Sequence, residues 1–205
     1  MSWPSWLPLR ETLRPLSAYG APQVPAQASL NTNENPYSPS PALQKAITDA
    51  VAQVAADLNR YPDRDATALR TKLAIYINER SGTGFTLDNI WAANGSNEII
   101  QSIFLAFAQG PVLGFTPSYS MHPLIAKTTG AHWIDGKRNA DFSLNTADAV
   151  SEILKYKPTL TFITTPNNPT GGAVTIDAIQ MLADAAKSIG GLLVVDEAYA
   201  EFSQE

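Results

Sequence analysis

The sequence LLVVDEAY at residues 192–199 decides the predicted fold. Its first four residues are apolar and follow Gly190 and Gly191, which is typical of a strand buried in a parallel sheet. Asp196 stands where this strand ends, and Tyr199 follows three residues later. In open α/β sheets, ligands bind beyond the carboxyl ends of the strands. We therefore expect Asp196 and Tyr199 to lie at a binding site.

A second strand end precedes this one in the sequence. The apolar residues 160–163 are followed by TTPNNPTGG at residues 164–172, a polar sequence typical of a turn. Between the two strands, Thr175 is the predicted N-cap of a helix whose apolar residues recur at helical spacing. The loops that follow the two strands are therefore predicted to share one edge of one sheet.

Strands and helices alternate over residues 90–196, which predicts an α/β fold with a parallel or mostly parallel sheet. Before residue 90 the pattern is one of helices and loops. Ser40 and Pro41 are typical of a helix start, and this helix is predicted to end near residue 58. The other predicted elements are a helix at about 65–80, strands at 90–93, 112–115, 131–134, 159–163 and 192–195, and a polar loop at 136–141.

Composition excludes several functional classes. The 205 residues carry a net charge of −5, which gives no basic field for nucleic acid or an anionic membrane. There is no cysteine, and neither His122 nor His132 has an acidic cluster beside it, so no metal site is expected. No apolar run approaches the roughly 20 residues of a membrane span. Prolines and an acid interrupt the N-terminal sequence MSWPSWLPLRE, unlike a signal peptide, and we expect a cytoplasmic location.

The sequence NGSNE at residues 94–98 places a glycine-containing turn before a predicted helix. Such a helix start presents backbone N–H groups and the positive end of the helix dipole, which together favour an anion. Ser96 or Asn97 could equally serve as a simple helix cap. The residues alone leave both interpretations open.

Two motifs, NNPTG at residues 167–171 and VVDEAY at 194–199, resemble those of the fold-type I aminotransferases, which depend on pyridoxal phosphate (PLP). Within that family the chain looks most like the histidinol-phosphate aminotransferases. Four further motifs carry this closer likeness: LNTNENPYSPSP, NRYPD, NGSNEII and TPSYSMH. The resemblance covers the chain from about Leu13 to its end.

The resemblance implies an incomplete, mostly parallel sheet of the large domain of these enzymes, with an N-terminal arm and a helical piece of the small domain. Residues 1–40 would form the arm and the substrate loop. Residues 41–205 would form a truncated PLP-binding large domain without its C-terminal half. Because the strand at 90–93 pairs with the last strand of the family sheet, we expect an unpaired edge there and a poorly stable or aggregating chain.

The resemblance also assigns residues to the cofactor phosphate and to the face of its ring. Gly95, Ser96 and Asn97 would cradle the phosphate, and Tyr119 would stack on the pyridine ring. A tyrosine at a strand end can also be an ordinary core residue, and that alternative stays open for Tyr119.

Three further residues are implied contacts of the polar atoms of the ring. Asn168 and Tyr199 would donate hydrogen bonds to the 3-hydroxyl oxygen, and Asp196 would keep the ring nitrogen protonated. Seen alone, Asn168 could serve only the turn, and Asp196 could be a structural acid at a strand end.

The remaining implied contacts lie early in the chain. Tyr61 would reach the cofactor phosphate of the other subunit of a homodimer, while Tyr19 and Asn35 would contact the substrate. The alternatives are a packing role for Tyr61, an Asx-type turn at Asn35 and a loosely ordered N-terminal arm.

The implied reaction transfers an amino group between L-histidinol phosphate and 2-oxoglutarate in histidine biosynthesis. An aromatic-amino-acid aminotransferase is the alternative. In the family a Schiff-base lysine follows the DEAY motif, and none of the seven lysines here has that context. We therefore expect these 205 residues to be an N-terminal portion that is inactive alone, or else a non-catalytic module. The seven are Lys45, Lys72, Lys127, Lys137, Lys155, Lys157 and Lys187.

Overall fold

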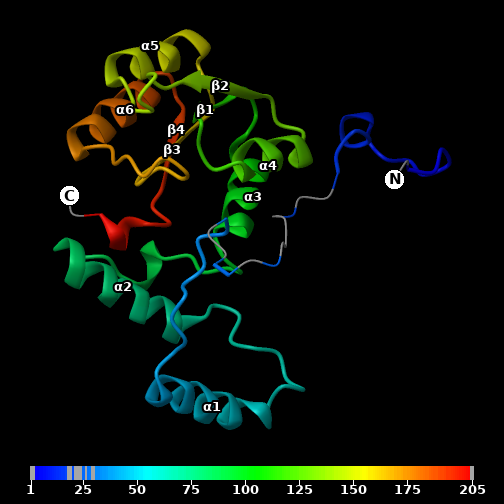
Figure 1. Cartoon of the computed structure of the whole chain (residues 1–205), viewed down its shortest axis with the longest axis vertical. Helices are drawn as coiled ribbons and strands as arrows, with labels where there is room; N and C mark the ends of the chain where they lie inside the picture. Colours follow the sequence, from blue (N-terminus) through cyan, green and yellow to red (C-terminus); the bar gives the residue numbers. More distant parts are fainter. Residues whose placement is uncertain (1–2, 18–19, 21–24, 26, 29–30, 204–205) are drawn as a thin grey trace. The chain divides into compact units, whose positions relative to one another are not determined.

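A computed structural model describes the chain except for residues 1–2, 18–19, 21–24, 26, 29–30 and 204–205 (Figure 1). The chain divides into two compact units. Unit 1 contains residues 1–15 and 93–205, and unit 2 contains residues 16–92. Each unit is described by itself.

Unit 1 is built on a four-stranded sheet in the order β2-β1-β3-β4, and every pair of neighbouring strands is parallel. The register pairs Thr164 at the end of β3 with Asp196 at the end of β4. The predicted common edge is thereby confirmed, and the two polar loops begin at the same level of the sheet. The strands are β1 (Val112–Thr116), β2 (Trp133–Lys137), β3 (Leu160–Thr164) and β4 (Leu192–Asp196).

Two pairs of helices cover the two faces of this sheet (Figure 1). Alternate residues of one strand point to opposite faces, so β3 contributes Phe162 to one apolar cluster and Ile163 to the other. Ile153 and Leu182 complete the cluster beneath α5 and α6, while the ring of Phe104 stacks on Phe162 at 5.2 Å beneath α3 and α4. The helices are α3 (Ser96–Phe107), α4 (Met121–Thr129), α5 (Thr146–Tyr156) and α6 (Ile176–Ser188).

The strand predicted at residues 90–93 is absent. Ile90 has extended backbone angles, φ −112° and ψ 129°, but no strand of the described residues pairs with this segment. Its carbonyl oxygen instead accepts a hydrogen bond from Arg70 Nε at 2.7 Å. The extended backbone of Ile90 agrees with the prediction, but a strand also requires a neighbour.

The burial predicted for β4 is also wrong. β4 is the edge strand beside β3, and its residues are half-buried, with Leu192 44% exposed. A continuous apolar run is typical of a strand that has a neighbouring strand on each side and a layer of helices on each face. Among the described residues β4 has one neighbour, and the fully buried strand is β3.

The strand predicted at residues 131–134 is β2, which starts two residues later than predicted. Gly130 ends α4 in the left-handed conformation, and the amide of Ala131 bonds to Ala126 of the same helix, so the strand starts only at Trp133. Gly136 was predicted to open a loop but is a buried strand residue. A Cβ atom at Gly136 would lie 2.8 Å from the Phe115 ring, which explains why glycine occupies a strand position.

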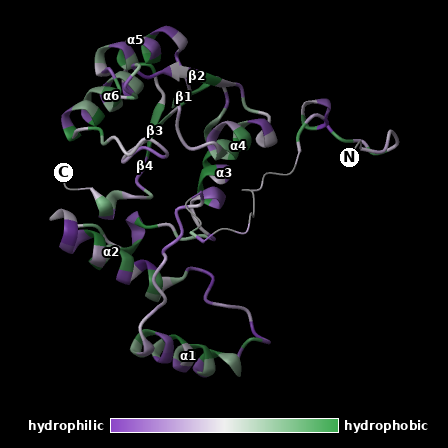
Figure 2. Cartoon of the chain, viewed as in Figure 1, coloured by the Kyte–Doolittle hydropathy of each residue, from purple (hydrophilic) through white to green (hydrophobic). Residues whose placement is uncertain are grey.

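Unit 2 contains two helices, α1 (Pro41–Ala55) and α2 (Thr67–Ser81), and the short 3₁₀ segment η2 (Leu87–Asn89). Ser40 caps α1 as predicted, with its Oγ accepting from the Leu43 amide at 3.3 Å. The helix ends at Ala55, short of the predicted residue 58, and its apolar residues Leu43, Ile47, Val51 and Val54 are more than half exposed. Figure 2 shows hydrophobic and hydrophilic residues interleaved along α1. Periodicity predicted this helix correctly, but it does not reveal whether the apolar face is covered.

Two more 3₁₀ segments belong to unit 1: η1 (Glu11–Leu13) and η3 (Ala200–Phe202). Arg10, just before η1, donates a hydrogen bond to the carbonyl of Thr128 in α4. Within the described part of the chain, no helix combines the length and the apolar character that crossing a membrane requires.

Candidate cofactor site

A cavity of unit 1 lies beyond the carboxyl ends of β1, β3 and β4. It brings together five of the residues that the sequence predicted for a cofactor, although they come from four different loops and helix starts. The lining consists of Ser96, Tyr119, Thr164, Asn168, Asp196, Ala198 and Tyr199.

The start of α3 forms one side of this cavity. Gly95 is its N-cap with φ 78°, a left-handed conformation that favours glycine, and no side chain of the described residues caps the helix. The alternative in which Ser96 or Asn97 caps the helix is therefore not what the structure shows. Asn97 Oδ1 instead accepts a hydrogen bond from the Tyr119 hydroxyl at 3.3 Å. The first-turn amides of α3 are left available for an anion.

Asp196 is the acidic group that lines the cavity, and its carboxylate is paired with a buried histidine. His122 Nε2 lies 3.1 Å from Asp196 Oδ2, and the two side chains are 2% and 9% exposed. The other oxygen, Oδ1, accepts from the Ala198 amide at 3.2 Å. Both carboxylate oxygens thus have a donor inside the protein, which fixes the orientation of the carboxylate.

His122 is a residue of this site that the sequence did not reveal. The sequence excludes it as a metal ligand, because no acidic cluster flanks it, and indicates no other role for it. Its ring packs edge-on against Tyr119 at 5.4 Å and lies 4.9 Å from the Phe162 ring. The available signal was its position three residues after Tyr119 at a helix start, which brings both side chains to one face.

Asn168 lies in a loop that folds back on itself. The amide of the preceding Asn167 donates to Gly172 O at 2.8 Å, and the Gly171 amide donates to Asn167 O at 2.7 Å. The loop therefore does form the turn that its sequence predicts. The turn and the cavity position of Asn168 coexist, so one interpretation does not displace the other.

Three of the predicted site residues do not belong to the described part of unit 1. Tyr61 and Asn35 belong to unit 2, where Tyr61 is fully exposed and Asn35 Oδ1 accepts from the Tyr37 amide at 3.0 Å, as in an Asx-type turn. Tyr19 lies outside the described residues.

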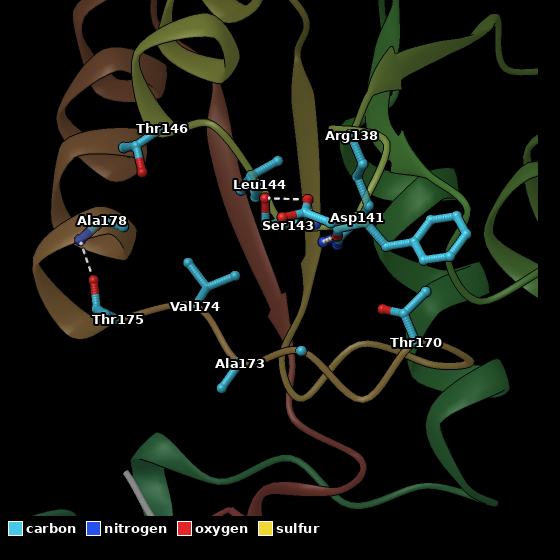
Figure 3. Close-up of a pocket in the computed structure, with 12 residues that line it drawn as sticks. Arg138, Asp141, Ser143, Leu144, Thr146, Thr170, Ala173, Val174, Thr175 and Ala178 are labelled. Atoms are coloured by element: carbon cyan, nitrogen blue, oxygen red, sulfur yellow. Dashed lines mark hydrogen bonds between the residues drawn. The ribbon is translucent and has the colours of Figure 1, made fainter.

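A second cavity of unit 1 lies between the β2–α5 loop and the β3–α6 loop. Figure 3 shows Arg138 and Thr170 on one side of it, and Thr146 and Ala178 on the other. Burial lowers the pKa of the Arg138 guanidinium below its usual value. Hydrogen bonds from Ser143 lower the pKa of the Asp141 carboxyl on the same rim.

The chemistry of the first cavity matches a phosphorylated aromatic cofactor. It combines an uncapped helix start for a phosphate, the Tyr119 ring for an aromatic face, and the Asp196 carboxylate for a protonated ring nitrogen. Fold and cavity together define an α/β protein whose cavity residues fit pyridoxal phosphate by residue type.

The chain belongs to the aminotransferase class I and II family, whose model matches residues 25–205. It is 52% identical to a histidinol-phosphate aminotransferase of Thermobifida fusca over 202 residues, 97% of this chain and 53% of that protein. It is 50% identical to a histidinol-phosphate aminotransferase sequence of Mycolicibacterium smegmatis, of which it covers 91%. Apart from the latter, the chain spans about half the length of the curated relatives it matches.

The fold agrees with this family. The structure of a histidinol-phosphate aminotransferase from Sinorhizobium meliloti in complex with pyridoxal 5′-phosphate superimposes with a TM-score of 0.67. The match covers 84% of this chain and 44% of that one at 22% identity. Unit 1 therefore contains part of the sheet of a fold-type I aminotransferase, as predicted.

Proposed function

We propose that this chain forms a PLP site of an aminotransferase that acts on L-histidinol phosphate. The observation that carries the proposal is the cavity in which Ser96, Tyr119, Asn168, Asp196 and Tyr199 meet. The identity of 50–52% to histidinol-phosphate aminotransferases supports this substrate. The alternative substrate, an aromatic amino acid, has no such support among these relatives.

PLP, when bound, accepts the electrons released at the α-carbon of an amino substrate. The helix start formed by Gly95, Ser96 and Asn97 binds its phosphate. The amides of Ser96 and Asn97 are the donors, since the Gly95 amide already donates to Ala93 O at 2.9 Å. Asp196, held by His122 at 3.1 Å, keeps a proton on the ring nitrogen, because a nearby negative charge favours the charged form. The face of the Tyr119 ring orients the cofactor.

The remaining groups act on the edge of the ring and on the substrate. Asn168 and Tyr199 donate hydrogen bonds to the 3-hydroxyl oxygen. Tyr61 reaches the phosphate of the partner subunit in a homodimer, and Tyr19 and Asn35 contact the substrate. The amino group is passed to 2-oxoglutarate.

A second candidate function is a binding module without catalysis. None of the seven lysines of the sequence lines the cavity, and transfer requires a lysine to move the proton at the α-carbon. We infer that the 205 residues alone bind the cofactor but do not transfer an amino group.

The test is a fluorescence titration of the purified chain with pyridoxamine phosphate. This probe keeps the ring and the phosphate but carries an amine in place of the aldehyde, so it cannot react with surface lysines. We expect saturable binding that Asp196→Ala abolishes and that the remote substitution Arg14→Met leaves unchanged. Binding that is absent, or equal in Asp196→Ala, refutes the proposed site.

The substrate is tested separately. If the reading frame continues beyond Glu205 to a lysine in the family context, kinetics of that longer protein decide the substrate. A larger kcat/KM for L-histidinol phosphate than for L-phenylalanine supports the proposal, and the reverse order supports the aromatic alternative.

A further inference from the structure

Asn167 joins three loops of unit 1. Its side chain is 2% exposed, and it precedes Asn168 in the β3–α6 loop. Its side-chain amide nitrogen donates to Pro117 O at 3.0 Å and to Thr170 Oγ1 at 2.7 Å. The first contact reaches the β1–α4 loop, two residues before Tyr119, and the second closes its own loop.

The acceptor of Asn167 is shared by two donors from the other two loops. Ser118 Oγ donates to Asn167 Oδ1 at 2.8 Å, and Arg138 Nη2 donates to the same oxygen at 3.1 Å. The amide group of Asn167 thus uses both its donors and both lone pairs of its oxygen. A buried amide that is fully paired in this way has one orientation.

The guanidinium group of Arg138 donates its hydrogen bonds to neutral oxygen atoms. Its Nε donates to Phe115 O at 3.2 Å and its Nη1 to Phe142 O at 3.3 Å, in addition to the bond to Asn167. None of the ion pairs found in the described part of the chain includes Arg138. A cation that contacts three carbonyl-type oxygens from β1, the β2–α5 loop and the β3–α6 loop acts as a clamp between them.

We infer that Arg138 is a positioning residue of the cofactor cavity. Through Asn167 it fixes the two loops whose next residues, Tyr119 and Asn168, line the cavity. The effect of Arg138 on cofactor affinity rests on the proposed function. Its effect on the order of the loops does not. Figure 3 shows the Arg138 side chain on the wall of the neighbouring cavity, on the same side as Thr170 of the clamped loop.

The planar fork of arginine explains why this residue type is needed. Three donors point in fixed, different directions, and a lysine ammonium on a flexible stem cannot reach Phe115 O, Phe142 O and Asn167 Oδ1 together. Arg138→Lys should therefore restore the charge without restoring the clamp.

The first experiment measures amide hydrogen exchange of the protein without ligand. In both Arg138→Met and Arg138→Lys we expect the protected amides of Asn167, Gly171 and Val174 to exchange roughly tenfold faster. The amides of α4 and β4 should keep their rates. The matched control is Arg14→Met, since Arg14 also donates to a carbonyl, Leu7 O at 3.0 Å, but lies in the N-terminal segment of unit 1.

The second experiment measures pyridoxamine phosphate affinity of the same variants. We expect a Kd roughly tenfold higher in Arg138→Met and unchanged in Arg14→Met. Unchanged exchange in the loop, faster exchange throughout unit 1, or a loosened loop with unchanged affinity each overturns the inference. If the wild type does not bind the probe, the proposed function fails, while loop exchange still decides whether Arg138 orders the loops. Should Arg138→Met not fold, the comparison of Arg138→Lys with wild type decides.

Discussion

Asp196→Asn should separate the structural role of Asp196 from its proposed role toward the cofactor. The Asn oxygen can accept from the Ala198 amide, as Asp196 Oδ1 does at 3.2 Å. The Asn side-chain amide nitrogen can donate to His122 Nε2, because a neutral imidazole can switch the nitrogen that carries its proton. Both hydrogen bonds of the carboxylate are then retained in a neutral form.

The structure sets the magnitudes of both effects. Since neither partner of a 3.1 Å contact is left unpaired, the free energy of unfolding should change by less than about 1 kcal/mol. The substitution replaces the negative charge that faces the protonated ring nitrogen by a neutral amide. At a side chain that is 9% exposed, the lost interaction is worth about 1.5–3 kcal/mol. That loss corresponds to a Kd for pyridoxamine phosphate roughly 10- to 100-fold higher.

Urea unfolding and a fluorescence titration on the same samples measure the two effects. A variant that binds the probe as tightly as the wild type refutes the assignment of Asp196 to the ring nitrogen. A variant that loses stability and affinity together would show that the carboxylate is mainly structural.

Four further outcomes follow from the geometry. His122→Leu leaves the Asp196 carboxylate without its donor at 3.1 Å, so urea unfolding should show a loss of about 1.5–3 kcal/mol, and an unchanged midpoint argues against the pair. Gly95→Ala forces a Cβ into φ 78° and should lower the unfolding free energy by about 1–2 kcal/mol and weaken probe binding. A Cβ at Gly84 likewise meets no atom within 4 Å, but Gly84 has no positive φ, so Gly84→Ala should be neutral in the same assays. Hydrogen bonds from the Thr67 and Asp65 amides lower the folded-state pKa of Asp63 below 3.8, so its stabilising contribution is present above that value and is lost as the pH falls through the lower, folded pKa. Urea midpoints of Asp63→Asn and wild type should accordingly differ at pH 7 and converge in acid, and a constant difference contradicts this. Finally, β4 presents an outer edge that no described strand pairs, so light scattering should detect aggregation on warming, and a sharp, reversible two-state melt would contradict this expectation.

The sequence predicted elements well where the local pattern is sufficient. The strand ends at Thr164 and Asp196 and the N-caps Ser40 and Thr175 lie where turn and cap residues indicated. It failed at residues 90–93, because a strand depends on a distant partner that no local pattern reveals. For the same reason, the apolar residues of β4 predicted burial, while the position of β4 at the edge of the sheet decides its exposure.

The candidate site shows the same division between local and distant information. Motifs predicted Asn168, Asp196 and Tyr199, and the structure places them in one cavity. They did not predict His122 or Arg138, which contact Asp196 and Asn167 across 74 and 29 residues of sequence. Pairs so far apart have no common spacing, so only the register of the sheet brings them together.

In each of two site loops, one residue lines the cavity and the residue before it forms hydrogen bonds inside the protein. In the β1–α4 loop Tyr119 lines the cavity while Ser118 bonds to Asn167, and in the β3–α6 loop Asn168 lines it while Asn167 is buried. In both loops the residue that lines the cavity directly follows one whose side chain bonds within the protein. The buried member needs a complete set of hydrogen bonds, because an unpaired buried amide costs about 1–3 kcal/mol. A substitution at Asn167 or Arg138 should therefore disturb cofactor binding as surely as one at Asn168, although neither of them lines the cavity.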